Sequence, residues 1–118
     1  MACYCAVDAS QKEIQFYEKS NGRVPFSDWM DSIEGQDIYE IVMLRLDRVE
    51  RGSLGETNNV GDGIAEMIID HGPGYRLYFG LIGPKGEIVV LLLGGSKRTQ
   101  DADIKLAKKY WNDKEFNR

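Results

Sequence analysis

Gly72-Pro73-Gly74-Tyr75-Arg76-Leu77-Tyr78-Phe79 is the stretch of sequence that decides the fold. Its two glycines and its proline predict a tight turn, and the residues after the turn alternate as a half-buried strand requires. Tyr75, Leu77 and Phe79 then share one face of the strand, whereas Arg76 and Tyr78 share the other. We expect the first set in the core and the second set in a common solvent-accessible groove.

Two further strands are predicted around this one, at residues 65–69 and 87–93, so that residues 75–82 form the middle strand. The connections are short and rich in glycine and proline, and such connections force antiparallel neighbours. Glu66 lies in the first of these strands and is expected to share the groove with Arg76 and Tyr78. The alternative is a cross-strand ion pair between Arg76 and Glu66, worth up to about 1 kcal/mol.

Helices are predicted on both sides of the three strands. Residues 25–33 begin with a proline and place apolar side chains at helical spacing. Residues 36–51 carry a longer apolar stripe that stops before Gly52, and this is the strongest helix pattern in the chain. Residues 99–112 begin at Thr99, a residue type that caps helices.

The elements together predict one α+β domain covering residues 1–118, with a small antiparallel sheet, two N-terminal helices and a C-terminal helix. Residues 12–19 alternate as a first strand. Residues 52–63 are rich in glycine and asparagine, and we expect them to form a mobile loop.

The composition is that of a globular protein, with 42% hydrophobic and 29% charged residues. No apolar run reaches the roughly 18 residues needed to cross a bilayer, and the first residues do not form a secretory signal, so we expect a cytoplasmic protein without membrane contact. Cys3 and Cys5 are too close for an ordinary disulfide, and no cysteine–histidine set completes a metal site. Reduced thiols, no metal and no cofactor are expected.

The charge is unevenly distributed. The net charge is −4, which argues against nucleic acid, but residues 1–75 hold 6 Lys and Arg against 14 Asp and Glu, whereas residues 76–118 hold 9 against 5. Salt screens charges over about 8–10 Å, so the local sign matters more to a bound phosphate than the total does. The basic groups gather where Arg76 and Lys97 lie.

Lys97 follows Gly94 and Gly95, between an apolar strand and a predicted helix, where backbone amides and cations could hold a phosphate. RNA is cut without a metal when its 2′-OH attacks the adjacent phosphorus, which requires an acid, a base and cations. His71 is the sole histidine, so catalysis by two histidines is excluded. The candidates that remain for acid and base are Glu66, Tyr78 and Lys97, with Arg76 as the cation.

The Gly-Pro-Gly-Tyr-Arg turn, followed by a Gly-Gly-x-Lys segment, resembles the RelE/ParE superfamily of type II toxin–antitoxin toxins, in particular the HigB-like addiction module killer branch. The resemblance covers residues 13–113. It implies a RelE-like fold and a cytoplasmic toxin that arrests growth and inhibits translation as a ribosome-dependent endoribonuclease acting on mRNA. It also implies a helix-turn-helix antitoxin, through which alone operator DNA is bound. Residues 1–11 precede the usual start of the pattern. Three interpretations are open for them: an added strand, a disordered tail, or a translation start assigned too far upstream.

The resemblance also assigns roles to individual side chains. It assigns catalysis to Arg76, Lys97 and Tyr78, and substrate binding to Arg98, Gln100 and Glu66. Members of the branch typically carry a Glu-Leu-Arg segment, and Glu66 matches its glutamate. This chain departs from the branch at the arginine position, which Ile68 occupies. Loss of that cation favours two alternatives: a non-nucleolytic ParE-type toxin that binds gyrase, and a degenerate toxin that serves as an antitoxin-binding, regulatory partner.

Overall fold

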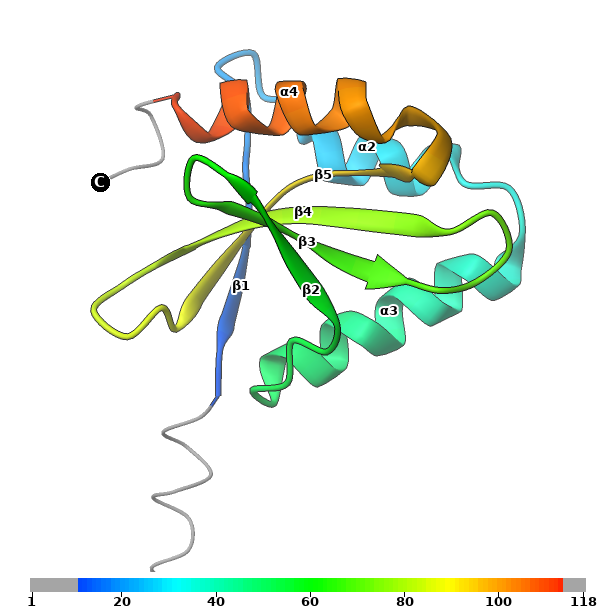
Figure 1. The fold of residues 1–118 in the computed structure, drawn as a ribbon, viewed down its shortest axis with the longest axis horizontal. Coiled ribbons are helices and arrows are strands. Elements are labelled where there is room, and N and C mark those ends of the chain that lie inside the picture. Colours follow the sequence, from blue (N-terminus) through cyan, green and yellow to red (C-terminus); the bar gives the residue numbers. More distant parts are fainter. Residues whose placement is uncertain (1–10, 114–118) are drawn as a thin grey trace, which may run out of the picture.

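A computed structural model describes residues 11–113 of the chain. The predicted N-terminal extension covers residues 1–11, of which residues 1–10, with the expected reduced thiols Cys3 and Cys5, lie outside the described residues. The described residues form three layers, in which a five-stranded sheet has two helices on one face and one helix on the other (Figure 1). The predicted α+β class is confirmed.

The sheet is mixed. Its strands are β1 (Glu13–Phe16), β2 (Thr57–Gly61), β3 (Ile64–Ile69), β4 (Tyr75–Ile82) and β5 (Ile88–Ser96). They lie in the order β1-β5-β4-β3-β2, and all neighbours are antiparallel except β1, which runs parallel to β5. The expectation of an antiparallel sheet is therefore wrong at this edge. Two helices and three strands separate β1 from β5, and a connection of that length permits parallel pairing.

The helices are α2 (Pro25–Ser32), α3 (Gln36–Glu50) and α4 (Gln100–Trp111), and α4 follows a single 3₁₀ turn, η1 (Lys97–Thr99). Both predicted N-terminal helices and the predicted C-terminal helix are confirmed to within two residues at each end. Within residues 11–113, no helix has the length and apolar character that crossing a membrane requires.

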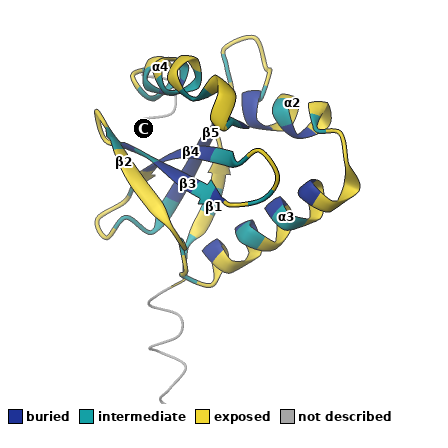
Figure 2. Cartoon of the chain, turned by 45° about the vertical axis from the view of Figure 1, so that its right-hand side comes forward, coloured by how far each residue is buried: buried dark blue, intermediate teal, exposed yellow. Residues whose placement is uncertain are grey.

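Both faces of the sheet are buried, as the colours of Figure 2 show for β3, β4 and β5. Leu77 and Phe79 pack with α2 and α3 on one face, as the alternation of β4 predicts. Tyr78 packs on the opposite face with Ala107 and other side chains of α4. The face that carries Arg76 and Tyr78 is therefore the face that α4 covers.

Two indole rings lie directly on glycines of the sheet. A Cβ added at Gly94 would overlap the ring of Trp29 from α2, and a Cβ added at Gly80 would overlap the ring of Trp111 from α4. The two glycines belong to opposite faces because Gly94 pairs in register with Leu77, and Gly80 lies three positions after Leu77 on β4. Beyond this pair, the register of β4 against β5 shifts between Tyr78 and Phe79. This irregularity changes which residues of β5 face α4 beyond the bulge.

Residues 52–63 are not a mobile loop, so that expectation is wrong. They include β2, which pairs with β3 at the edge of the sheet. The guanidinium of Arg45 on α3 donates hydrogen bonds to the backbone oxygens of Leu54, Glu56 and Ile68, at 2.8–3.1 Å. Charged donors make stronger hydrogen bonds than neutral ones, so Arg45 fixes this segment to α3 and β3.

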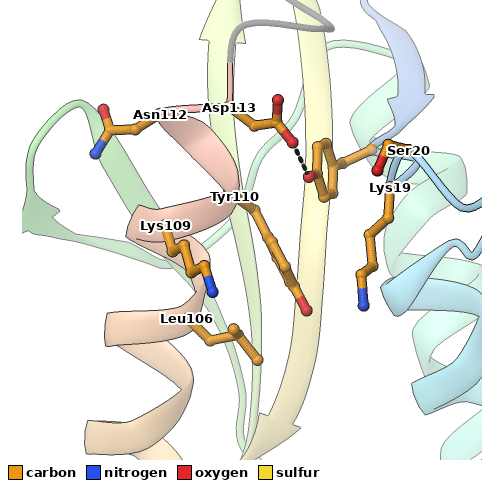
Figure 3. A pocket seen from close by; sticks show the side chains of 8 residues that line it. Lys19, Ser20, Leu106, Lys109, Tyr110, Asn112 and Asp113 are labelled. Atoms are coloured by element: carbon orange, nitrogen blue, oxygen red, sulfur yellow. Dashed lines mark hydrogen bonds between the residues drawn. The ribbon is translucent and has the colours of Figure 1, made fainter.

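The far end of α4 is held against the end of β1. The Tyr17 hydroxyl donates a hydrogen bond to Asp113 Oδ2 at 2.6 Å, and the rings of Tyr17 and Tyr110 stack with centroids 4.9 Å apart (Figure 3). The opposite end of α4 begins beside Arg76, so the helix connects two regions of the surface that are distant from each other.

Candidate functional site

Arg76 and Lys97 meet at the turn that precedes β4. Arg76 pairs in register with Gly95 of β5, which ends just before Lys97. Arg76 Nη1 and Lys97 Cβ each lie 3.7 Å from the point that a Cβ would occupy at Gly74. The Arg76 guanidinium and the base of the Lys97 side chain thus lie beside one glycine, and the prediction that the two residues lie at the ends of neighbouring strands is confirmed.

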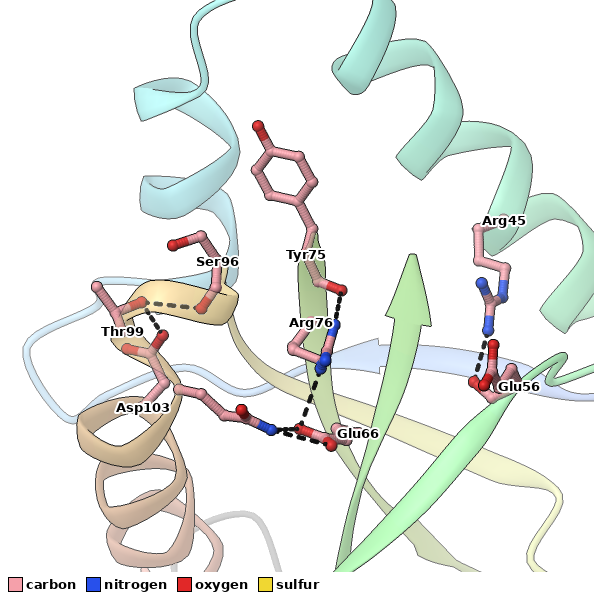
Figure 4. Close-up of polar contacts among 9 residues, drawn as sticks. Arg45, Glu56, Glu66, Tyr75, Arg76, Ser96, Thr99 and Asp103 are labelled. Carbon is pink, nitrogen blue, oxygen red and sulfur yellow. Dashed lines mark hydrogen bonds and ion pairs between the residues drawn. The ribbon is translucent and has the colours of Figure 1, made fainter. Parts of the chain in front are cut away.

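The guanidinium of Arg76 is partly buried and faces the carboxylate of Glu66 (Figure 4). Arg76 Nε lies 3.7 Å from Glu66 Oε1, with the side chains 12% and 3% exposed, and Arg76 Nη1 donates to the backbone oxygen of Tyr75 at 3.3 Å. The alternative of a cross-strand ion pair is therefore confirmed.

Gln100, the first residue of α4, covers this pair. Gln100 Nε2 lies 3.0 Å and 3.2 Å from the two carboxylate oxygens of Glu66 and donates to them. The expected open groove is wrong at Glu66, because the start of α4 and the strand beside it exclude solvent from the carboxylate.

Tyr78 is fully buried beneath α4, with an exposed fraction of 0%. Its hydroxyl has no hydrogen-bond partner among the described residues. Burial raises the pKa of Tyr78 well above its usual range, and the nearby Glu66 carboxylate raises it further. The prediction that Tyr78 faces a solvent-accessible groove is wrong, and this hydroxyl would reach a substrate only if α4 moved away.

The start of α4 is organised by Thr99, which the sequence predicted only as a helix cap, and by Asp103. Thr99 Oγ1 donates a hydrogen bond to Asp103 Oδ2 at 2.6 Å, instead of capping a backbone amide, and burial raises the pKa of Asp103. A Cβ at Gly95 would overlap this carboxylate. The signal was the spacing of Thr99 and Asp103, since residues four apart on a helix are neighbours.

Lys97 and Arg98 are exposed at the end of β5. The backbone amide of Lys97 donates to Gly74 O at 2.9 Å, so it is not free to bind a phosphate oxygen as the sequence suggested. Ile68 pairs in register with Arg76, directly across β3 and β4. A cation at position 68 would therefore stand beside Arg76, and in this chain an apolar side chain takes its place.

The described residues form five surface cavities, and neither Arg76 nor Lys97 lines any of these five. Within residues 11–113, no group of three or more His, Cys, Asp or Glu side chains is arranged to hold a metal ion. The side chains beside Arg76 that carry chemistry are thus one carboxylate, one amide and the exposed amine of Lys97.

Comparison with known proteins adds one relative. No family model matches the chain. A protein of Haemophilus influenzae (strain ATCC 51907 / DSM 11121 / KW20 / Rd), described as an uncharacterized protein, is 41% identical over 83 residues, which make up 70% of this chain and 82% of the relative.

Proposed function

The chain belongs to the same family as this Haemophilus influenzae protein, and we propose that it is a HigB-like toxin of the RelE/ParE superfamily, with a RelE-like fold, that cleaves mRNA on the ribosome. The single observation that supports the proposal best is that Arg76 Nη1 and the base of the exposed Lys97 side chain both lie beside Gly74, because both side chains can then extend to one phosphate. The proposal also places the protein in the cytoplasm, where ribosomes translate.

The proposed reaction is a transesterification within the RNA. The 2′-oxygen forms a bond to phosphorus while the bond from phosphorus to the 5′-oxygen breaks, which leaves a 2′,3′-cyclic phosphate. Lys97 gives a proton to the leaving 5′-oxygen, and water takes the proton of the 2′-OH. Arg76 and Lys97 stabilise the charge that develops on the phosphate oxygens.

Glu66 and Gln100 position Arg76 in this proposal and do not contact the RNA. Glu66 is 2% exposed, and its two oxygens accept hydrogen bonds from Gln100. A carboxylate held in this way attracts the guanidinium at the start of β4, while Arg76 Nη1 lies beside Gly74. Tyr78 lies behind this group and takes no part, whereas the exposed Arg98 adds charge for the RNA backbone.

One observation favours a second candidate function. The guanidinium of Arg76 is already paired with Glu66, and the side chain is only 12% exposed. With Ile68 at the neighbouring position, such a site suits a protein that binds an antitoxin or gyrase without cutting RNA. The ParE-type and degenerate alternatives rest on this arrangement.

Growth and mRNA integrity in the same cells separate the candidates. The chain is expressed without antitoxin as wild type, Arg76→Ala, Lys97→Ala and Lys85→Ala, the last being a matched control in the exposed turn between β4 and β5. The endoribonuclease proposal expects growth arrest with new mRNA 5′ ends in wild type and control, and neither effect in the other two. Arrest with intact mRNA would select the gyrase-binding alternative.

A further inference from the structure

A cavity of about 440 Å³ lies at the end of α4 that is remote from Arg76. Its walls come from the end of β1, from the turn that follows β1, and from the last two turns of α4, as Figure 3 shows. The volume falls within the range of about 300–1,000 Å³ that is typical of small-molecule sites. The proposed cleavage reaction makes no use of this cavity.

Two amines flank the cavity from opposite sides. Lys19 reaches it from the turn after β1, and Lys109 reaches it from α4 (Figure 3). Neither lysine forms an ion pair within residues 11–113, whereas Lys108 on the adjacent position of α4 lies 3.7 Å from Asp62. Two ammonium groups exceed the charge of Asp113 together with the roughly half charge at the C-terminus of α4. The charge of Asp28 also reaches Tyr110, but this carboxylate is paired with Arg23 at 3.0 Å. The cavity therefore favours an anion.

The wall between the amines is aromatic and apolar. Tyr110 and Leu106 form it, and Tyr110 is fixed in place by stacking on the buried ring of Tyr17. Ser20 adds a polar side chain to the lining, and Asn112 lines the cavity at the end of α4, with its amide directed away from Tyr110 in Figure 3. A rigid aromatic wall with polar groups at its edge matches a nucleobase, which has a flat apolar face and a rim of donors and acceptors.

We propose that this cavity binds one nucleotide, with its phosphate between Lys19 and Lys109 and its base against Tyr110 and Leu106. The same chemistry is offered by a free nucleotide and by a nucleotide within an RNA strand. The turn that carries Lys19 is preformed, because Lys19 N donates to Arg23 O at 2.8 Å and Gly22 N donates to Lys19 O at 2.8 Å. Little ordering is then required when the ligand binds.

The possibility that the bound nucleotide belongs to an RNA strand rests on the proposed function. Lys105 and Lys109 are exposed and lie on one side of α4, since residues four apart on a helix are neighbours. Arg98 is exposed in η1, just ahead of the helix, and the exposed Asp101 lies one turn before Lys105 on the same side. The 12 residues of α4 span about 18 Å. An RNA strand whose cleaved phosphate lies at Arg76 and Lys97 could follow this basic stripe and place a neighbouring nucleotide in the cavity.

The test is a titration followed through the backbone amide signals of the folded chain by nuclear magnetic resonance. The probes are uridine 5′-monophosphate, a six-nucleotide oligouridine RNA and inorganic phosphate. We expect the nucleotide or the RNA to shift the amide signals of Lys19, Ser20, Tyr110 and Asn112. Lys19→Gln and Lys109→Gln should each weaken binding about tenfold, which corresponds to ~1.4 kcal/mol, whereas Lys85→Gln, the matched control, should leave it unchanged.

Each outcome decides the proposal. Binding of the mononucleotide that both cavity variants weaken supports a free nucleotide as ligand. Binding of the RNA alone, with a salt dependence that falls by about 0.7 in logarithmic slope for each lysine removed, supports a strand along α4. The proposal is overturned if neither probe shifts these signals at millimolar concentration, if the cavity variants behave like Lys85→Gln, or if inorganic phosphate binds as tightly as the nucleotide. None of these results depends on RNA cleavage, so nucleotide binding at this cavity and the proposed endoribonuclease function are tested independently.

Discussion

Replacement of Tyr78 by Phe tests the burial of this ring beneath α4. The hydroxyl is buried without a hydrogen-bond partner among the described residues, and such a group carries a desolvation penalty of about 1–3 kcal/mol. Removal of one oxygen leaves a void no larger than that of a methyl group, whose loss costs roughly 0.5–1.5 kcal/mol. The difference lies between about −0.5 and 2.5 kcal/mol, so Tyr78→Phe is expected to raise the free energy of unfolding by about 1 kcal/mol.

The assay is equilibrium unfolding in urea, followed by tryptophan fluorescence, with Tyr39→Phe as the matched control. Tyr39 is 42% exposed on α3, so loss of its hydroxyl should change stability by no more than about 0.5 kcal/mol. A Tyr78→Phe variant that is more than about 1 kcal/mol less stable than wild type would refute the reasoning, because the hydroxyl would then make a stabilising interaction. The variant should also still arrest growth, since the ring does not reach the substrate.

Three further predictions follow from the packing, the titration and the charge of the chain. Gly94→Ala should destabilise the fold by about 1–3 kcal/mol, because the added methyl group overlaps the ring of Trp29. A Gly94→Ala/Trp29→Leu double variant should recover part of that stability. If the effects of the two substitutions on the free energy of unfolding simply add, the contact is contradicted. Burial raises the pKa of Asp103 above the 3.8 of an unperturbed aspartate. The proton that the folded state binds more tightly therefore stabilises the fold below about pH 4, and this contribution is lost as pH rises through the folded pKa. Asp103→Asn should therefore gain stability relative to wild type between pH 4 and pH 7, and a constant difference in unfolding free energy would rule out the buried carboxylate. The neighbouring reading frame is expected to encode the antitoxin, a helix-turn-helix protein. This antitoxin should bind over the basic residues 76–118 or displace α4, and its affinity should fall as salt is added. Salt-independent binding confined to α3 would contradict this prediction.

The meander of β3, β4 and β5 could be predicted from sequence because its turns are marked by glycine and proline and its strands alternate clearly. The same reasoning placed Arg76 near Lys97, since the start of one strand and the end of the next lie side by side in an antiparallel pair. Local signals were sufficient for these features. They were also sufficient for α3, whose apolar stripe spans the whole helix.

The remaining features depend on contacts between distant residues. β2 was missed because Asn58 and Asn59 have low strand propensity, and the segment is held by Arg45 from α3. The closure of the site over Glu66 depends on Gln100, which is 34 positions away in the chain. Alternation indicates which side chains share a face, but it does not indicate whether a helix covers that face, so the burial of Tyr78 could not be predicted.

The most direct test of the central claim is cleavage of a defined mRNA on purified ribosomes, read as the rate at which new 5′ ends appear. Free metal beyond the magnesium that ribosomes need is removed by chelation. The account predicts cleavage by wild type and by Lys85→Ala at equal rates, and a loss of about 10²–10³-fold for Arg76→Ala and for Lys97→Ala, the size expected when one transition-state donor is removed. Intact mRNA with the folded wild-type chain, or equal rates in all four proteins, would contradict the assignment of Arg76 and Lys97.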